Sequence, residues 1–199
     1  MNKITWATPL YEFLRQCNAS PLNKIVLDCG AGGNLPPLSL FYQNGYKTCG
    51  IEIAQPALDE SAIFCRENDM LLNIFRGDMR AIPFEDQFFS FAYSFNAIMF
   101  MTKPDIAIAM AEIKRVLKPG GLVYVNFESV DDPDDSVFCE TAPAVDLLKS
   151  TRFAKHEDNE ADEYFENFVI LRKQKSWLEK LFNENILEQV NIEYIARKI

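Results

Sequence analysis

Short apolar runs that alternate with helical patterns limit the fold of this chain more than any other feature. The first run, residues 23–29 (NKIVLDC), is typical of a strand that is buried on both faces of a sheet. A glycine-rich break and a helical pattern follow it. Later strand-like runs cover residues 46–53, 71–75, 88–95 and 122–127. Because strands alternate with helices, the sequence predicts βαβ crossovers and an α/β fold with a doubly wound, mostly parallel sheet.

The predicted helices carry boundary signals. Residues 1–23 place apolar side chains at three- and four-residue spacing and predict a helical cap before the first strand. Pro56 opens a second helical pattern, and Thr102 is a predicted N-cap with Asp105 in the first turn. Pro119, Gly120 and Gly121 are expected to end the helix that starts near Thr102 and to lead into the strand that follows.

The C-terminal part has a different pattern. Two β-rich stretches, 165–181 and 190–196, flank a turn-like Asn183–Asn185 and predict a final antiparallel pair. Residues 129–160 show no periodicity and are expected to form a loop with one short helix. The predicted organisation is one domain over 1–199, with a helical cap at 1–23, a ligand-binding half at 24–127, an acidic segment at 128–166 and a C-terminal hairpin at 167–199.

The net charge of −9 is concentrated in the acidic segment. Residues 128–166 contain 13 acidic and 3 basic residues, so the rest of the chain is close to neutral. Nucleic acid is not an expected partner, because its phosphate backbone attracts Lys and Arg. No apolar run approaches the roughly 20 residues of a membrane helix, and the N-terminal residues lack the pattern of a signal peptide. We therefore expect a cytoplasmic protein without a membrane partner.

The cysteines do not form a recognisable framework. Their number is odd and no CxxC pair occurs, which argues against disulfides and against a zinc site. They are predicted to be reduced, mostly buried thiols. The five are Cys17, Cys29, Cys49, Cys65 and Cys139.

Three predicted strands end in residues that suit a nucleoside ligand. In a doubly wound sheet, ligands bind beyond the carboxyl ends of the strands. The first strand ends in Asp28 and is followed by Gly30 and Gly32, which let the backbone approach a ligand closely. The carboxylate of Glu52, after the second strand, can accept both hydroxyls of a ribose. Asp78, after the third strand, can accept from an adenine amine.

Each of these features alone has a simpler explanation. The glycine run is also compatible with a tight turn that binds nothing, Glu52 with a solvated carboxylate at a strand end, and Asp78 with an Asp turn. The 24-residue interval from Asp28 to Glu52 also suits a dinucleotide site, so it does not separate the two kinds of cofactor.

The motifs become specific when they are taken together. The chain contains, in order, VLDCGAGGN at 26–34, GIEI at 50–53, GDMRAIPFEDQFFSFAYSFNAI at 77–98 and EIKRVLKPGGLVYVNF at 112–127. This series resembles the successive motifs of class I S-adenosylmethionine-dependent methyltransferases over residues 24–127, with a compatible tail to residue 199. RVLKPGG is the most discriminating part, because nicotinamide-dependent dehydrogenases have nothing comparable there.

The resemblance implies a Rossmann-like three-layer sandwich with a seven-stranded sheet whose C-terminal strand is antiparallel, and S-adenosyl-L-methionine as the cofactor. Gly30 and Gly32 would line the methionine portion, with Asp28 orienting the loop or reaching the cofactor amine through water. Glu52, with Ile53 beside it, would hold the ribose. The other implied contacts are Asp78 and Met79 at the adenine, and the backbone near Phe95 and Asn96 at the amino-acid end.

Three positions depart from the family pattern. Asn34 stands where a third glycine is usual, and asparagine tolerates the left-handed φ that such a position can require. Ser90 replaces the usual aspartate in the strand that leads to Phe95, and it is expected to loosen that end of the site. Residues 95–98 (FNAI) differ from the Asp/Asn-Pro-Pro-aromatic pattern of amine methylases that act on bases or glutamine, which argues against such acceptors.

The function implied is methyl transfer to a small-molecule acceptor by in-line displacement, promoted by alignment. No residue is predicted as a catalytic base. The acidic segment is expected to form part of a lid that favours a neutral or cationic acceptor, although a solvated acidic loop is an equally simple interpretation. We expect a monomer or a homodimer. The alternatives are a non-catalytic module that binds S-adenosylmethionine and, less favoured, a nicotinamide-dependent oxidoreductase.

Three further groups are expected to have no catalytic part. His156 lies in an acidic stretch and is predicted to be an exposed, solubilising residue. Residues 131–135 (DDPDD) offer oxygen atoms but lack the glycine and the distal glutamate of a calcium loop, so no metal site is predicted. Trp6 and Trp177 are predicted to be packing residues, with Trp6 also placed to cover a pocket.

Overall fold

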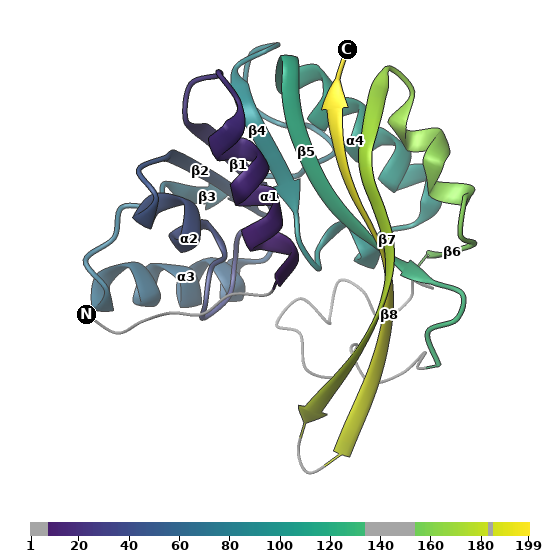
Figure 1. Ribbon diagram of the computed structural model, residues 1–199. Coiled ribbons are helices and arrows are strands. Elements are labelled where there is room, and N and C mark those ends of the chain that lie inside the picture. Colours follow the sequence, from purple (N-terminus) through teal and green to yellow (C-terminus); the bar gives the residue numbers. More distant parts are fainter. Residues whose placement is uncertain (1–7, 134–153, 183–184) are drawn as a thin grey trace.

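One mixed sheet organises the structure, a computed structural model that describes residues 8–133, 154–182 and 185–199. The strands lie in the order β3-β2-β1-β4-β5-β8-β7, and the short β6 pairs with β5 off this path (Figure 1). Neighbouring strands from β3 to β5 are parallel, whereas β8 is antiparallel to β5 and to β7. The bounds are β1 Ile25–Cys29, β2 Lys47–Glu52, β3 Ile74–Arg76, β4 Phe89–Ser94, β5 Leu117–Ser129, β6 Lys155–His156, β7 Phe168–Phe182 and β8 Asn185–Lys198.

This topology confirms the predicted doubly wound sheet with an antiparallel C-terminal strand. Within the described residues, it adds the two-residue β6 to the seven expected strands. The predicted C-terminal hairpin is also confirmed, since β7 and β8 pair along almost their whole length.

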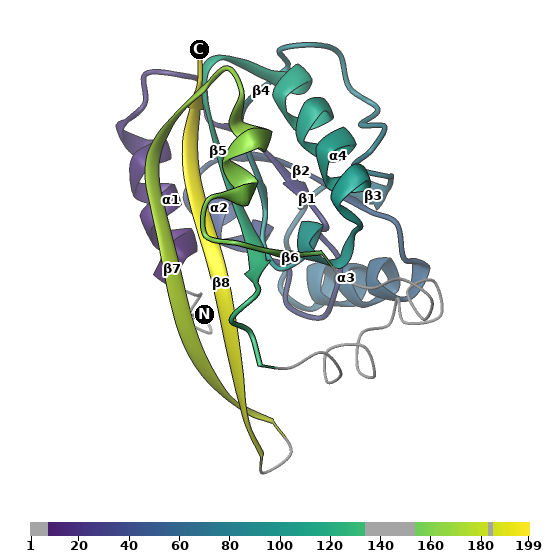
Figure 2. The ribbon, with the colours of Figure 1, turned by 90° about the vertical axis from the view of Figure 1, so that its right-hand side faces the viewer.

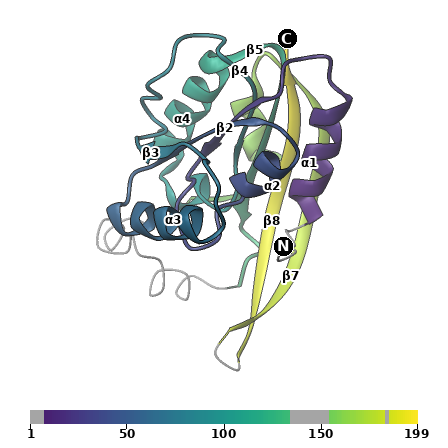
Figure 3. The ribbon, with the colours of Figure 1, turned by 90° about the vertical axis from the view of Figure 1, so that its left-hand side faces the viewer.

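Helices cover both faces of the sheet. The first three helices pack on one face, around an apolar cluster that includes Phe13, Phe41 and Phe64. The fourth helix and the second 3₁₀ helix pack on the other face, around a cluster that includes Ile113 and Phe165. Figure 2 shows α1 and α4 on opposite sides of the sheet, and Figure 3 shows α3 near the β3 edge. The helices are α1 Thr8–Ala19, α2 Leu38–Gln43, α3 Gln55–Glu67, η1 Ile98–Phe100, α4 Lys103–Val116 and η2 Glu160–Phe165.

The start of α4 confirms the predicted cap. Thr102 has an extended backbone, and its hydroxyl accepts from the backbone N–H of Asp105 at 3.3 Å. A capping side chain satisfies one of the N–H groups that a helix leaves without an internal partner. Pro104 stands in the first turn, where no N–H is needed.

Three element boundaries differ from the sequence prediction. β3 begins at Ile74, because Asn73 adopts a left-handed φ of 56° and donates its side-chain amide to Thr48 O. β5 begins at Leu117, so the predicted stop at 119–121 lies inside its irregular first part, where Gly120 has a φ of 76°. Phe165 belongs to η2 and not to the following strand.

The C-terminal hairpin extends well past the end of β5 (Figure 1). β8 pairs with β5 from Arg197, opposite Leu122, to Asn191, opposite Glu128. Because β8 is antiparallel, its first half lies at the carboxyl edge of the parallel strands, where ligands bind in such folds. No helix in the described ranges is long and apolar enough to cross a membrane.

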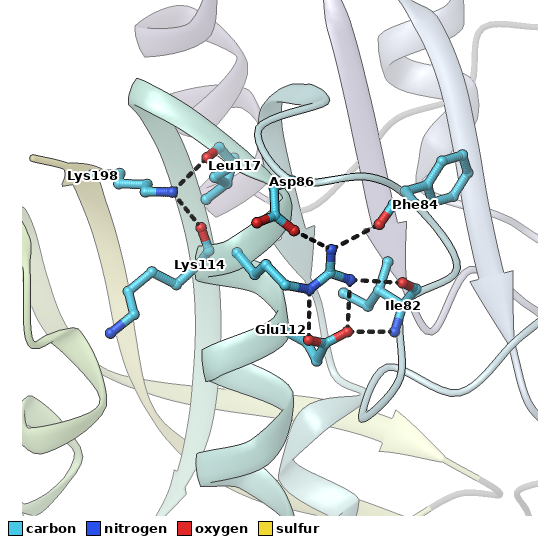
Figure 4. A network of polar contacts seen from close by, with 8 residues as sticks. Ile82, Phe84, Asp86, Glu112, Lys114, Leu117 and Lys198 are labelled. Atoms are coloured by element: carbon cyan, nitrogen blue, oxygen red, sulfur yellow. Dashed lines mark hydrogen bonds and ion pairs between the residues drawn. The ribbon is translucent and has the colours of Figure 1, made fainter.

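Arg115 joins α4 to the loop that precedes β4 (Figure 4). Its guanidinium donates to both oxygens of Glu112 at 2.7 and 2.8 Å, and to Asp86 Oδ1 at 2.8 Å. The same group donates to the backbone oxygens of Ile82 and Phe84 at 2.8 Å. Glu112 also accepts from the Ile82 N–H. This network gives a physical reason for Glu112 and Arg115 in the EIKRVLKPGG sequence, because the two side chains fix a loop that is not part of the sheet.

We expect Arg115→Met to lower the free energy of unfolding by about 1–3 kcal/mol, because several charge-assisted hydrogen bonds are lost together. The matched control is Arg15→Met, which removes an exposed ion pair with Glu12 within α1. That change should alter the free energy of unfolding by only about 0.5 kcal/mol. Urea unfolding of the two variants measures both effects, and equal losses would contradict the importance of the Arg115 network.

Candidate functional site

The turn after β1 packs against the end of β2 at the carboxyl edge of the sheet. The backbone N–H groups of Gly30 and Ala31 donate to Ile51 O at 2.9 and 3.0 Å. Gly33 N–H donates to Ala57 O at the start of α3, at 2.8 Å. Three backbone hydrogen bonds therefore fix the turn against β2 and α3.

Glycine is required at two places in this turn. A Cβ added to Gly30, which has a φ of 99°, would lie 2.2 Å from the Cβ of Ala97. A Cβ at Gly32 would lie 2.6 Å from Ala57 Cβ and 2.7 Å from Glu52 Cγ. Real carbon atoms do not approach so closely, so each position excludes any side chain. The turn thus touches both the loop after β4 and the carboxylate side chain after β2.

Asn34 does not use the left-handed backbone expected of it. Within the described residues, the positive φ angles of the turn belong to Gly30 and Gly33. The asparagine therefore replaces a glycine without strain.

Glu52 is positioned by two backbone amides. Its Oε2 accepts from Gly32 N at 3.2 Å, and its Oε1 accepts from Ala54 N at 2.8 Å. The side chain is half-buried, so the carboxylate remains partly accessible. Ile53, the next residue, is exposed. A carboxylate fixed in this way can accept two further hydrogen bonds from a diol.

Asp28 is buried beneath the turn, in register with Tyr93 of β4. Burial raises the pKa of Asp28 to about 8, and the charge of Glu52 adds to the rise. Neither Asp28 Oδ2 nor the Tyr93 hydroxyl has a hydrogen-bond partner among the described residues. The carboxyl is therefore neutral at pH 7 and carries a proton that it can donate.

Asp78 and Met79 follow β3 on the other side of the turn. Both carboxylate oxygens of Asp78 accept from Arg80, with Nη2 at 2.7 Å, and this partner lowers the pKa of Asp78. Arg80 also donates to Asp105 at 3.1 Å. Met79 is buried, and its methyl carbon lies 3.8 Å from the position that a Gly30 Cβ would take. The Asp78 side chain is thus fixed by Arg80, and the Met79 side chain packs beside the glycine turn.

The loop after β4 is fixed by Ser94. Its hydroxyl donates to Cys29 O at 2.9 Å and accepts from Ile98 N at 3.0 Å, which ties the ends of β1 and β4 together. Asn96, with a φ of 52°, turns the chain back over the sheet. The half-buried Phe95 packs beside Tyr124, with ring centroids 6.2 Å apart.

Asn126 of β5 is a site residue that the sequence argument missed. Its Oδ1 accepts from Asn96 N, and its Nδ2 donates to Asn96 Oδ1, both at 2.8 Å. The pair fixes the loop in its left-handed turn. The available signal was a polar residue inside an otherwise apolar strand, LVYVNF.

Ser90, which was expected at one end of the site, lies elsewhere in the strand. Ser90 is the second residue of β4 and is fully buried at the amino end of that strand, so it lies away from the glycine turn. Its hydroxyl has no partner among the described residues. The strand-end contact that the site needs comes instead from Ser94.

His156 is not an exposed residue, as the sequence had suggested, but is fully buried. Its ring lies 5.1 Å from that of Phe127, and Nε2 is 3.2 Å from the Tyr164 hydroxyl. Burial and the charge of Lys103 lower its pKa. The acidic neighbours of His156 in the sequence suggested an exposed side chain, but β6 places the ring between β5 and η2.

Other expectations for single residues had mixed outcomes. Trp177 is 65% exposed and is not a packing residue. Four cysteines are free thiols, of which Cys17 and Cys29 are buried and Cys49 and Cys65 half-buried. Trp6 and Cys139 lie outside the described residues. In the part of the chain that the structure describes, no three His, Cys, Asp or Glu residues gather in a way that could hold a metal ion.

A hollow of about 630 Å³ lies at the opposite, amino edge of the sheet. Lys24, Lys47 and Lys118 line it together with Glu85 and Asp86. It includes none of the residues of the glycine turn, so it is separate from the site described above.

Comparison with known families gives a match within the predicted ligand-binding half of the chain, residues 24–127. A family model described as a methyltransferase domain matches residues 27–125. A sterol 24-C-methyltransferase of Gibberella zeae is 29% identical over 102 residues, which are 50% of this chain and 26% of the relative. A sterol 4-C-methyltransferase of Caenorhabditis elegans is 32% identical over 120 residues, 55% of this chain and 33% of that relative. The chain therefore spans about a quarter to a third of the curated relatives it matches.

Solved structures share the fold over nearly the whole chain. A SAM-dependent methyltransferase of Methanosarcina mazei superposes with a TM-score of 0.66 at 20% identity, covering 93% of this chain and 97% of the other. A 1,6-didemethyltoxoflavin-N1-methyltransferase of Burkholderia thailandensis, solved with S-adenosylhomocysteine, superposes with a TM-score of 0.67 at 15% identity, covering 96% and 77%. The Rossmann-like fold is thereby confirmed.

The raised pKa of Asp28 predicts a particular pH dependence of stability. A carboxyl that binds its proton more tightly in the folded chain favours folding most below its ordinary pKa of 3.8, and this contribution is lost as the pH rises towards about 8. One full proton changes stability by about 1.4 kcal/mol per pH unit. The amide side chain of the variant Asp28→Asn cannot titrate. Urea unfolding at pH 5, 6.5 and 8 should therefore show the free energy of unfolding of Asp28→Asn rising relative to that of the parent as the pH increases. Parallel curves would contradict a neutral Asp28, and Asp59→Asn, at an exposed position of α3, is the control.

Proposed function

Because the chain belongs to the class I S-adenosylmethionine-dependent methyltransferases, we propose that it transfers a methyl group from S-adenosyl-L-methionine to a small-molecule acceptor. The observation that carries the proposal is the glycine turn, which excludes any Cβ and lies against a carboxylate held by two backbone amides. Nothing in a ligand-free turn demands a half-buried glutamate at that place.

The described residues fit this cofactor. Gly30 and Gly32 would lie along its methionine portion and Glu52 along its ribose diol, with Ile53 beside it. The neutral Asp28 beneath the turn would orient the loop and reach the cofactor amine through water. The remaining contacts would come from Asp78 and Met79 at the adenine, and from the backbone of Phe95 and Asn96 at the amino-acid end.

When bound, the cofactor supplies a methyl group already activated by a sulfonium. The work left to the chain is to align the acceptor and to keep water out. Asn126 and Ser94 support this role, because they fix the loop of residues 95–97 that would face the amino-acid end of the cofactor. A base is needed only for an acceptor that must lose a proton. We assign none.

We propose further that the acceptor is a neutral or cationic small molecule and that part of the acidic segment 128–166 borders it. The curated relatives act on sterols, and the toxoflavin-type relative on a heteroaromatic ring, so the family accepts small molecules of different shape. Of the described acids in this segment, Asp131 and Asp158 bind Lys175, which places them beside the hairpin. Asp134 and Asp135 lie outside the described residues.

A cytoplasmic monomer or homodimer is the accompanying proposal. Its support is the four free thiols, which are typical of a reducing compartment. A module that binds the cofactor without transferring its methyl group is the alternative, and it would show binding with no labelled product in any acceptor pool.

The cofactor choice is tested by melting the purified protein with S-adenosylhomocysteine or with NAD. A ligand at about 100 times its Kd stabilises the folded state by about 2.7 kcal/mol, which gives a clear rise of Tm. We expect such a rise with S-adenosylhomocysteine and none with NAD. The opposite pattern would favour the oxidoreductase, and no rise with either ligand at millimolar concentration would remove the basis of the proposal.

Glu52→Ala should weaken S-adenosylhomocysteine binding at least tenfold, because a charged hydrogen bond contributes about 1.5–3 kcal/mol. The measurement is titration calorimetry, with Glu67→Ala at the exposed end of α3 as the control for loss of one charge. Glu52→Gln keeps the shape of the side chain and removes its charge, so a loss of affinity in this variant reports on the charge and not on a change in the fold. If Glu52→Ala binds the ligand as the parent does, the ribose is held elsewhere.

A further inference from the structure

Four buried polar side chains form a patch on β5 and β8, called the polar patch below: Asn126, Glu128, Asn191 and Glu193. Asn126 lies opposite Glu193, and Glu128 lies opposite Asn191. Residues that are directly opposite in an antiparallel pair point to the same face, so all four lie together. Each is less than 9% exposed.

The polar patch begins where the apolar core on the same face ends. Tyr124 and Ile195, the pair one step closer to the amino edge, belong to the cluster beneath α1. The opposite face of the same strands stays apolar, with Phe127, Ile192 and Tyr194 in the other cluster. Burying polar groups lowers stability unless they are paired. Packing of the sheet therefore gives no reason for polar residues here.

Contacts join the polar patch to the glycine turn. Asn126 makes two hydrogen bonds with Asn96 and one with the Met99 sulfur, and Ala97, which follows Asn96, touches the Gly30 position. Asn126 therefore adjoins the loop that would face the amino-acid end of the cofactor, and the second pair of the patch, Glu128 and Asn191, lies further along β5 and β8.

Two groups in and beside the patch have unused hydrogen-bonding capacity. Within the described residues, Asn191 Oδ1 and the Tyr124 hydroxyl have no hydrogen-bond partner, although both side chains are at most 2% exposed. Glu193 Oε1 accepts from the Ser176 hydroxyl at 2.8 Å. A buried oxygen without a partner is costly, and its retention suits a partner that arrives with a ligand.

The charges of the patch are balanced from within the chain. Lys155 Nζ lies 3.7 Å from Glu128 Oε1. The charge of Arg172 acts on Glu193 and partly offsets the rise of its pKa that burial causes. Lys155 thus lies beside one of the two carboxylates, and the rise in the pKa of Glu193 shows that burial disfavours a charge there. What the patch offers is hydrogen-bond acceptors.

We infer that the polar patch binds the methyl acceptor, and that this acceptor is an uncharged molecule with at least two hydrogen-bond donors of the O–H or N–H type. Asn191 Oδ1 and the Glu193 carboxylate accept from those donors and present the reacting atom over the loop at Asn96. The inference rests on the proposed methyl transfer and narrows its acceptor from neutral or cationic to uncharged and hydrogen-bonding.

The test begins with methyl-labelled S-adenosylmethionine and an ultrafiltered small-molecule extract of cells that carry the protein. The labelled product should stay in the water phase during hexane extraction and should pass both cation- and anion-exchange resins. A product retained on either resin, or one that moves into hexane, overturns the acceptor class. No labelled product at all overturns the proposed methyl transfer on which the inference rests.

Two variants then test the residues. Asn191→Leu and Glu193→Gln should each lower the methylation rate at limiting extract about tenfold or more, because each removes one buried hydrogen bond to the acceptor. The rate should recover as the extract is concentrated, because the loss lies in KM. The Kd of S-adenosylhomocysteine should stay within about twofold, which a damaged fold would not allow.

Glu188→Gln makes the same chemical change on the same strand at an exposed position and should leave both quantities unchanged. If both patch variants methylate the extract as the parent does, the patch does not bind the acceptor, even where the cofactor is bound and used.

Discussion

The approach of Gly30 to Ala97 is the contact on which the site depends. A hydrogen atom is all that fits between the turn after β1 and the loop after β4, since a Cβ would lie 2.2 Å from its neighbour. The hydroxyl of Ser94 holds the same two segments from within the sheet. Because these loops are in contact, the carboxylate of Glu52 and the amides of Asn96 and Asn126 lie together at the carboxyl edge of the sheet. Each other feature of the site follows from this closeness.

The polar groups at that edge are ordered before any ligand is present. Glu52 is fixed by two backbone amides, Asp78 by Arg80, and Asn96 by Asn126. Groups held by the protein itself lose little freedom when a ligand arrives, so more of the interaction energy remains for binding. Asp28 differs, because its buried carboxyl is kept neutral by its surroundings and contributes a proton in place of a charge.

Local signals explain what could be predicted from the sequence. The apolar runs, the Thr102 cap and the glycine turn each depend on neighbours in the chain, and the structure has them where they were expected, within a few residues. The misses depend on distant partners. His156 is buried by Phe127 of another strand, Asn126 bonds a loop 30 residues earlier, and the Asn73 side chain reaches Thr48. Periodicity and motif spacing carry no information about such pairs.

The reversed direction of β8 separates two tasks within one strand. Lys198, near its end, donates to the carbonyls of Lys114 in α4 and Leu117 at the start of β5, and so fastens the strand to the core. Residues 191–193 lie in the middle of the strand, opposite the last part of β5. Changes in this short stretch leave the fastening intact and do not reach the glycine turn. If β8 binds the acceptor as proposed, a handful of substitutions in one strand can change which molecule is bound, while residues 24–127 stay the same.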